Sequence, residues 1–283
     1  MMNKTTRSLA FTILLAGTPM CLAQEEIFHF SLDEGSGVEA RSSGSSAATL
    51  EIGSGMGWAL KGGGADGGTA ITRVGDGESY LKSTSKLESF GEWSSYTVTG
   101  WVKPFSEEPF RATLFSVLDP AGSGFQLQLV TRKGKANEPA WVCSLVSRAG
   151  TPGSAAGIWS PWGNPFSSGN FSPDEWIFFA VVIDPANRLN RFVEFFMGTK
   201  DRPVVSAGGF RLGENADPET YQLRDIAEVG MGNLSGAKSG FPIGLSIDDI
   251  RFFGSAEKNG GALALAALEN IRLEAVEKAG ASK

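Results

Sequence analysis

The chain consists largely of short runs of aromatic and β-branched residues, each closed by a cluster of glycine, serine, proline or asparagine. Such runs form β-strands, and the clusters between them form turns. The predicted strands cover residues 27–32, 49–52, 58–61, 80–83, 96–104, 112–117, 125–131, 140–146, 175–184, 191–197, 226–230 and 245–253. Glycine accounts for 37 of the 283 residues, about twice its usual share, without the three-residue period of collagen. We therefore expect an all-β fold with many tight turns.

Two of these runs indicate how the strands are buried. In the first run, residues 96–102, successive side chains alternate between the two faces of the strand. Tyr96, Val98, Gly100 and Val102 fall on one face, and Thr97, Thr99 and Trp101 on the other. The second run, residues 176–183, is apolar on both faces. A strand of that kind lies in the middle of a two-layer structure and is covered on each side. The pattern predicts an antiparallel sandwich of two sheets.

The end of the chain has a different character. Residues 261–278 are rich in alanine, leucine and glutamate and predict a single helix. At helical spacing its apolar residues fall on one side, with Arg272 at the edge of the stripe: Ala264, Leu265, Leu268, Ile271, Ala275 and Val276. A stripe of this width predicts a helix that packs on the sandwich, and a partner-binding helix is the alternative. We expect a sandwich at residues 24–256 and the helical segment at 257–283.

The first 23 residues predict a secretory signal peptide. Lys4 and Arg7 precede a short apolar stretch, residues 8–17, and a small-residue cleavage site ends at Ala23. The stretch is too short to span a bilayer, which needs about 20 apolar residues. We expect a secreted protein that is extracellular, periplasmic or bound at the cell surface, with no transmembrane segment.

Charge and cysteine content exclude two classes of protein. Acidic residues outnumber basic ones by 31 to 25, and removal of residues 1–23 lowers the formal net charge from −6 to −8. An acidic chain without a basic run repels phosphate backbones, so nucleic acid is not an expected partner. The mature chain retains only Cys143, which excludes an intramolecular disulfide. Cys143 lies in an apolar run and is expected to be a buried, unreactive thiol.

Five segments occur in an order known from one family: residues 29–50, 57–60, 96–104, 175–181 and 247–253. Together they resemble LamG-like jelly-roll domains of the concanavalin A-like lectin/glucanase superfamily, over nearly all of residues 26–270. The resemblance implies a jelly-roll sandwich with a short helix after the last strand. Residues 147–173 depart from the family because they are longer and more aromatic than its usual connection.

The superfamily includes glycoside hydrolases, so a pair of catalytic carboxylates is the first chemistry to seek. Retaining enzymes hold two carboxyl groups about 5–5.5 Å apart. Asp248 and Asp249 form the only pair of adjacent acids on a predicted strand, and adjacent strand residues point to opposite faces. His29 is the only histidine, is expected to be a packed strand residue, and leaves no Ser-His-Asp set or zinc site. These features favour a protein that is not an enzyme.

The resemblance also implies a structural Ca²⁺ where the first and last strands meet. Asp33 and Asp248 are the implied side-chain ligands, with loop carbonyls nearby, and Glu34 and Asp249 are weaker candidates. Calcium takes 6–8 oxygen ligands, including carbonyls from glycine-rich turns. Alternation places Asp248 on the same face as Ile250 and Phe252. The alternative is that Asp33 caps a turn and Asp248 accepts hydrogen bonds from backbone amides.

A second candidate site is the aromatic stretch 157–166. It carries Trp159, Trp162, Asn164 and Phe166, with two prolines, in what we predict to be a loop. Sugar faces stack on aromatic rings, and amides bind hydroxyl groups, so these side chains are a candidate glycan platform. The alternative is a loop that buries its rings over the sheet.

The sequence thus predicts a secreted, noncatalytic binding module whose partner is a glycan or an extracellular surface protein. Two alternatives remain. One is a polysaccharide hydrolase or lyase of the same superfamily, and the other is a purely structural cell-surface protein.

Overall fold

The structure is a computed structural model. It describes residues 24–76, 78–84, 93–104, 111–119, 124–132, 135–146, 155–159, 175–211, 222–224, 226–232, 245–257 and 259–281. The expected signal peptide, residues 1–23, lies outside the described residues.

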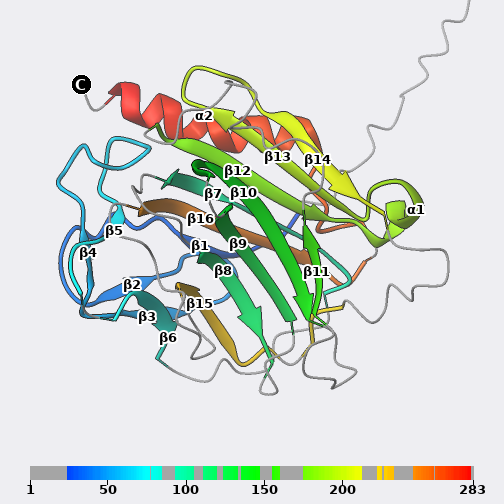
Figure 1. Cartoon of the computed structure of the whole chain (residues 1–283), viewed down its shortest axis with the longest axis horizontal. Coiled ribbons are helices and arrows are strands. Elements are labelled where there is room, and N and C mark those ends of the chain that lie inside the picture. Colours follow the sequence, from blue (N-terminus) through cyan, green and yellow to red (C-terminus); the bar gives the residue numbers. More distant parts are fainter. Residues whose placement is uncertain are drawn as a thin grey trace, which may run out of the picture.

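The described strands form two antiparallel sheets (Figure 1). Sheet I has the order β14 (Val205–Phe210), β13 (Val193–Thr199), β12 (Ile177–Ile183), β7 (Ser95–Pro104), β16 (Leu245–Ser255), β5 (Ile71–Arg73) and β4 (Met56–Trp58), with β1 (Glu26–Phe30) also paired to β16. Sheet II has the order β11 (Ala155–Trp159), β10 (Lys135–Val146), β9 (Gly124–Arg132), β8 (Arg111–Leu118), β15 (Glu228–Gly232), β6 (Tyr80–Ser83), β3 (Thr49–Ile52) and β2 (Glu39–Arg41). The fold is the predicted jelly-roll sandwich. Each of the twelve expected strands overlaps a strand of the structure, and four more, β2, β5, β11 and β14, complete the sheets.

Strand β12 confirms the two-sided burial expected of it. All seven of its residues are buried. Phe179 and Val181 belong to the core between the sheets, whereas Phe178 and Ala180 belong to a second apolar cluster on the outer face of sheet I. One face of β12 is therefore covered by the core between the sheets, and the other by the outer cluster, which includes Leu268 of the C-terminal helix.

Aromatic contacts join the two sheets across the main core. The rings of Tyr96 in sheet I and Phe125 in sheet II meet edge to face, with centroids 5.6 Å apart. Phe115 of sheet II stacks on Phe252 of β16 at 5.9 Å. Trp101, on the opposite face of β7 from Tyr96, lies outside this core, as the alternation of residues 96–102 predicts.

The C-terminal helix α2 (Leu265–Ala281) lies across the outer face of sheet I (Figure 1). Its buried residues Leu268 and Ile271 pack in one cluster with Trp101. The remaining helical turns, η1 (Pro185–Asn187) and α1 (Arg188–Arg191), connect β12 to β13.

Helix α2 begins four residues later than predicted. The side chain of Ser95 accepts a hydrogen bond from the amide of Gly261, and the hydroxyl of Thr97 accepts one from the amide of Leu263. These hydroxyls from β7 hold the approach to the helix in a non-helical path. As a result Leu263 is buried, and Leu265, predicted to lie on the packed side, is 48% exposed.

Candidate functional site

Strand β16 has a bulge at Asp248 and Asp249. Its register against β7 shifts directly after Asp248, and Asp249 has a left-handed φ of 46°. Asp248 pairs with Trp101 on the outer face of sheet I, whereas Ile250 and Phe252 lie in the core between the sheets. The prediction that Asp248 lies on the same face as Ile250 and Phe252 is therefore wrong. It assumed strict alternation, and one extra residue in a strand reverses the faces that follow.

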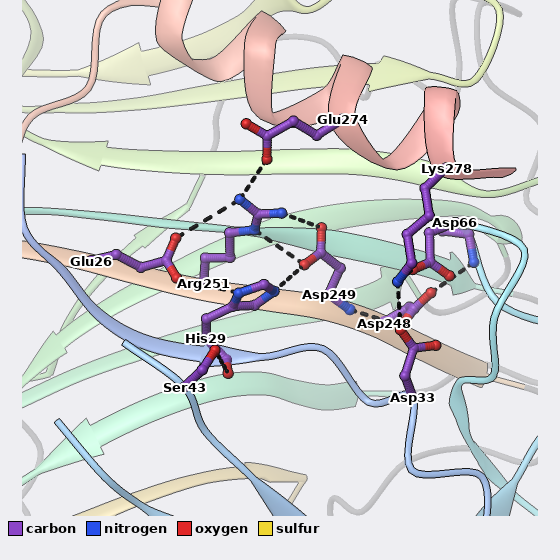
Figure 2. A network of polar contacts seen from close by, with 11 residues as sticks. Glu26, His29, Asp33, Ser43, Asp66, Asp248, Asp249, Arg251, Glu274 and Lys278 are labelled. Atoms are coloured by element: carbon purple, nitrogen blue, oxygen red, sulfur yellow. Dashed lines mark hydrogen bonds and ion pairs between the residues drawn. The ribbon is translucent and has the colours of Figure 1, made fainter. Parts of the chain in front are cut away.

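The same bulge brings both adjacent carboxylates to the outer side of sheet I. Asp249 binds the side chains of His29 and Arg251, and Arg251 pairs with Thr99 on that outer side. The expectation that Asp248 and Asp249 point to opposite faces is therefore wrong, because the bulge turns both side chains to the same side. Two neighbouring acids thus face the helix rather than the core (Figure 2).

Three carboxylates, which we call the carboxylate cluster, meet beside the end of α2: Asp33, Asp66 and Asp248 (Figure 2). Asp33 follows β1, Asp66 lies in the loop between β4 and β5, and Asp248 lies in β16. Backbone amides of the loop bind one oxygen of each. Ala65 donates to Asp248 Oδ2 at 2.7 Å, Gly68 to Asp66 Oδ1 at 2.8 Å, and Thr69 to Asp33 Oδ1 at 3.1 Å.

Glycine at position 68 is required for this close approach. A Cβ built there would lie 1.9 Å from Asp33 Oδ1, so no larger residue fits while the loop keeps its path. Sequence reasoning missed Asp66. The signal was present, since Asp66 follows three glycines and Ala65 and precedes two more glycines, and glycines allow a backbone to wrap closely around a side chain.

Asp248 is fully buried, and burial raises its pKa well above the ordinary range of an aspartate. The negative charge of Asp66 raises the pKa further, and the hydrogen bond from Ala65 opposes the shift. The backbone amide of Asp249 donates to Asp248 Oδ1 at 2.9 Å. A carboxyl group in these surroundings is held by backbone amides and is closed to a substrate.

Lys278, in the last turn of α2, brings a positive charge to the cluster. Its Nζ lies 2.6 Å from Asp33 Oδ2 and also binds Asp66 Oδ2. Burial lowers the pKa of Lys278, but its hydrogen bonds to the two carboxylates outweigh this and raise the pKa above its usual value. The lysine is therefore protonated and links the end of the chain to its first strand.

The structure brings the two predicted calcium ligands, Asp33 and Asp248, into one cluster. Both also show the alternative contacts, because each accepts a hydrogen bond from a backbone amide. A calcium ion bound by Asp33 and Asp66 would take the place of the Lys278 ammonium group. Within the described residues, no group of three or more His, Cys, Asp or Glu side chains has a metal-binding arrangement. Calcium therefore stays a prediction.

A second polar network surrounds His29. Its Nε2 lies 2.6 Å from Asp249 Oδ1, and its Nδ1 lies 3.3 Å from Glu26 Oε1. Arg251 binds Asp249 Oδ1 from Nε at 3.1 Å and Glu274 of α2 from Nη1 at 2.9 Å (Figure 2). The network joins β1, β16 and the helix by charge.

His29 is charged rather than a base. Burial lowers its pKa, but hydrogen bonds to Asp249 and Glu26 raise it to about 9. The interaction with His29 also contributes to lowering the pKa of Asp249, against its burial. Ser43 donates its hydroxyl to the backbone carbonyl of His29, not to the imidazole. A protonated imidazole cannot accept a proton from a hydroxyl group, so these residues do not form a nucleophilic triad.

The outer face of sheet II carries a row of polar positions, which we call the polar row: Glu51, Lys82, Gly230, Ser116 and Gln126. Each is the cross-strand partner of the next, so all share one face. Their sequence neighbours, among them Val117 and Leu127, lie in the core. The centre of this face is covered, because Ser116 is completely buried and donates a hydrogen bond to the carbonyl of Gly230.

A second row crosses the same face beside the first. Thr113 pairs with Gln128, Gln128 with Val142, and Val142 with Trp159 at the edge of the sheet. Gln128 and Thr113 are buried and hydrogen bonded to each other at 3.3 Å. Trp159 therefore ends strand β11, whereas the sequence predicted a loop there. The other three residues of the predicted platform, Trp162, Asn164 and Phe166, lie outside the described residues.

Neither the models of known protein families nor the sequences of curated proteins match the chain. Solved structures are similar in fold. One is a botulinum neurotoxin type C structure described by its interaction with two ganglioside molecules, with a TM-score of 0.52 and 8% identity over 89% of this chain and 51% of that one. A SAP-like pentraxin from Limulus polyphemus has a TM-score of 0.43 and 11% identity, over 69% of this chain and 75% of that one. A Trypanosoma rangeli sialidase has a TM-score of 0.44 and 12% identity, over 88% of this chain and 32% of that one.

The chain spans about half the length of the neurotoxin structure. At this identity the similarity concerns the fold alone. Among the described helices, none combines the length and the apolar character needed to cross a membrane. The two sheets, the order of their strands and the neurotoxin similarity together identify a jelly-roll sandwich of the concanavalin A-like type.

Proposed function

We propose that the protein is a secreted, LamG-like glycan-binding module and that the glycan binds on the outer face of sheet II, towards its β11 edge and away from its covered centre. The observation that carries this proposal is the polar character of that face. On this face the central strands carry hydroxyl and amide groups instead of apolar side chains, and hydrogen bonds hold Ser116, Thr113 and Gln128 in place. Gln126, which is partly exposed, carries an amide of the kind that binds sugar hydroxyls, whereas Ser116, Gln128 and Thr113 are buried.

The position of Trp159 supports the same face. Its backbone ends the row that begins with Thr113 and Gln128, on the last strand of the described sheet. Sugar sites usually combine amide groups with aromatic residues, because aromatic rings stack on the apolar face of a sugar. We include Trp162, Asn164 and Phe166 in the proposed site because they follow Trp159 within seven residues.

Binding without catalysis is part of the proposal. Asp248, the acid with the strongly raised pKa, is fully buried and cannot touch a substrate. His29 is protonated near neutral pH and cannot act as a base. A ganglioside-related neurotoxin structure with the same fold adds support for a glycan partner rather than a nucleic acid.

A glycan array with four variants tests the proposal. Trp159→Ala, Trp162→Ala and Gln126→Ala are expected to weaken binding by roughly 5- to 30-fold, since loss of a stacking or hydrogen-bonding group removes about 1–2 kcal/mol. Leu273→Ala is the control, because Leu273 is partly exposed on α2 at the other side of the sandwich. Each variant is first checked for an unchanged melting temperature. Binding that survives all three substitutions, or a wild type that binds no glycan, would contradict the proposal.

A further inference from the structure

The carboxylate cluster gathers negative charge in a place with little access to water. Asp248 is fully buried, Asp66 is 4% exposed, and the side chain of Asp33 is 27% exposed. Backbone amides satisfy one oxygen each of Asp33 and Asp66, which leaves the Oδ2 atom of both to another donor. Like charges held together with little access to water oppose folding unless a cation lies between them. The cluster therefore needs a cation in the folded state.

The chain supplies that cation from its own C-terminal helix. The ammonium group of Lys278 binds the Oδ2 atoms of Asp33 and Asp66, the two atoms that the backbone leaves unbound (Figure 2). Lys278 lies 245 residues from Asp33 and 212 from Asp66 along the sequence. The contact thus depends on the helix being packed against the sandwich.

The last turn of α2 has little else to hold it. Beyond Ala275 no side chain of the helix is buried, and Val276 is only half-buried. Glu274 binds Arg251, Ala275 belongs to the outer apolar cluster and Val276 packs against it, but no residue of the helix after Val276 is part of that cluster. The ion pairs of Lys278 are placed to fix these final residues.

We propose that the ammonium group of Lys278 is the resident cation of the carboxylate cluster. The C-terminal helix brings this group into place, and it balances the carboxylates in place of the calcium ion that the resemblance implies. Folding of the mature chain then needs no divalent cation. The end of the chain also stabilises the segment after β1, because Lys278 binds Asp33 there. The function is distinct from glycan binding, since the cluster lies on sheet I and the proposed glycan site on sheet II.

The first test uses the wild type. Its melting temperature is expected to be the same in millimolar calcium chloride and in a chelator. A lower melting temperature in the chelator would mean that a metal ion, not Lys278, balances the cluster, and would overturn the proposal. This measurement requires no variant to fold.

The second test uses charge compensation. Lys278→Met keeps the length of the side chain and is expected to lower the melting temperature by roughly 2–4 °C, a small effect because the lysine is half exposed. Asp66→Asn added to Lys278→Met is expected to recover part of that loss, because it removes one of the repelling charges. Lys278→Arg should stay close to the wild type, and Glu277→Gln is the matched control on the exposed side of the same turn.

The direction in which Asp66→Asn changes the melting temperature of the Lys278→Met variant distinguishes the proposal from a role of the lysine side chain in packing alone. If Asp66→Asn lowers the melting temperature of the Lys278→Met variant further, the carboxylates do not repel one another, and Lys278 is not their counter-charge. The same conclusion follows if Lys278→Met melts like Glu277→Gln.

Discussion

The charge on His29 predicts a stability that falls as the pH rises. Burial lowers the pKa of His29, but Asp249 and Glu26 raise it to about 9 in the folded state, while nearby Arg251 opposes them. In the unfolded chain a histidine has a pKa of about 6.5. Because the folded state holds the proton more tightly, the contribution is complete below about pH 6.5 and disappears as the pH passes about 9.

The size of the effect follows from the difference between the two pKa values. Each unit corresponds to about 1.4 kcal/mol, so the charged His29 contributes about 3 kcal/mol at about pH 6. About 2 kcal/mol should remain near pH 7.5, and almost none near pH 10. The side chain of His29 is 22% exposed, so solvent screens the interaction only in part.

Urea unfolding of the wild type and of His29→Gln across this pH range measures the contribution. Other groups titrate in both proteins, so the difference between their free energies of unfolding isolates His29. Ser43→Ala is the control, since its hydroxyl contacts only the backbone carbonyl of His29. The reasoning is refuted if wild type and His29→Gln give parallel curves, or if their difference grows with pH.

Three substitutions test the packing, each through the urea concentration at the midpoint of unfolding. Gly100→Ala should cost about 1–3 kcal/mol because its Cβ would lie 2.3 Å from Cδ1 of Ile250, and an unchanged midpoint would mean that the core yields easily. Leu268→Ala, at a fully buried position of α2, should cost about 2–5 kcal/mol, whereas a helix that is only loosely attached would lose little. Arg272→Ala should cost about 2–4 kcal/mol, since Arg272 is buried and donates to the carbonyl of Thr199 at 2.7 Å; a smaller loss would show that water replaces the guanidinium.

The strands that sequence reasoning missed lie where local pattern is weakest. β2, β11 and β14 are the end strands of their sheets, and β5 has only three residues. Strand β14 has the sequence Val-Ser-Ala-Gly-Gly-Phe, which contains two glycines and resembles a turn. An edge strand gains its hydrogen bonds from one neighbour that is already in place, so pairing rather than propensity decides its conformation.

The candidate site was predictable only in part. Asp33 and Asp248 were found through a resemblance, and the structure places both in one cluster. Asp66 and Lys278 come from distant parts of the chain, and neither carries a local motif that links it to the others. Alternation also failed at Asp249, because a bulge depends on how β16 meets its neighbours.

The sequence by itself determined the class of fold. Turn clusters between β-branched runs, the two-sided apolar strand at residues 177–183 and the alanine-rich end specify strands, their burial and one helix, since these properties depend on neighbouring residues. The tertiary structure decided which charges meet. Lys278 reaches Asp33 because the helix crosses sheet I and brings the end of the chain to the end of its first strand. Contacts between residues more than 200 positions apart follow from the path of the whole chain, and no local pattern encodes them.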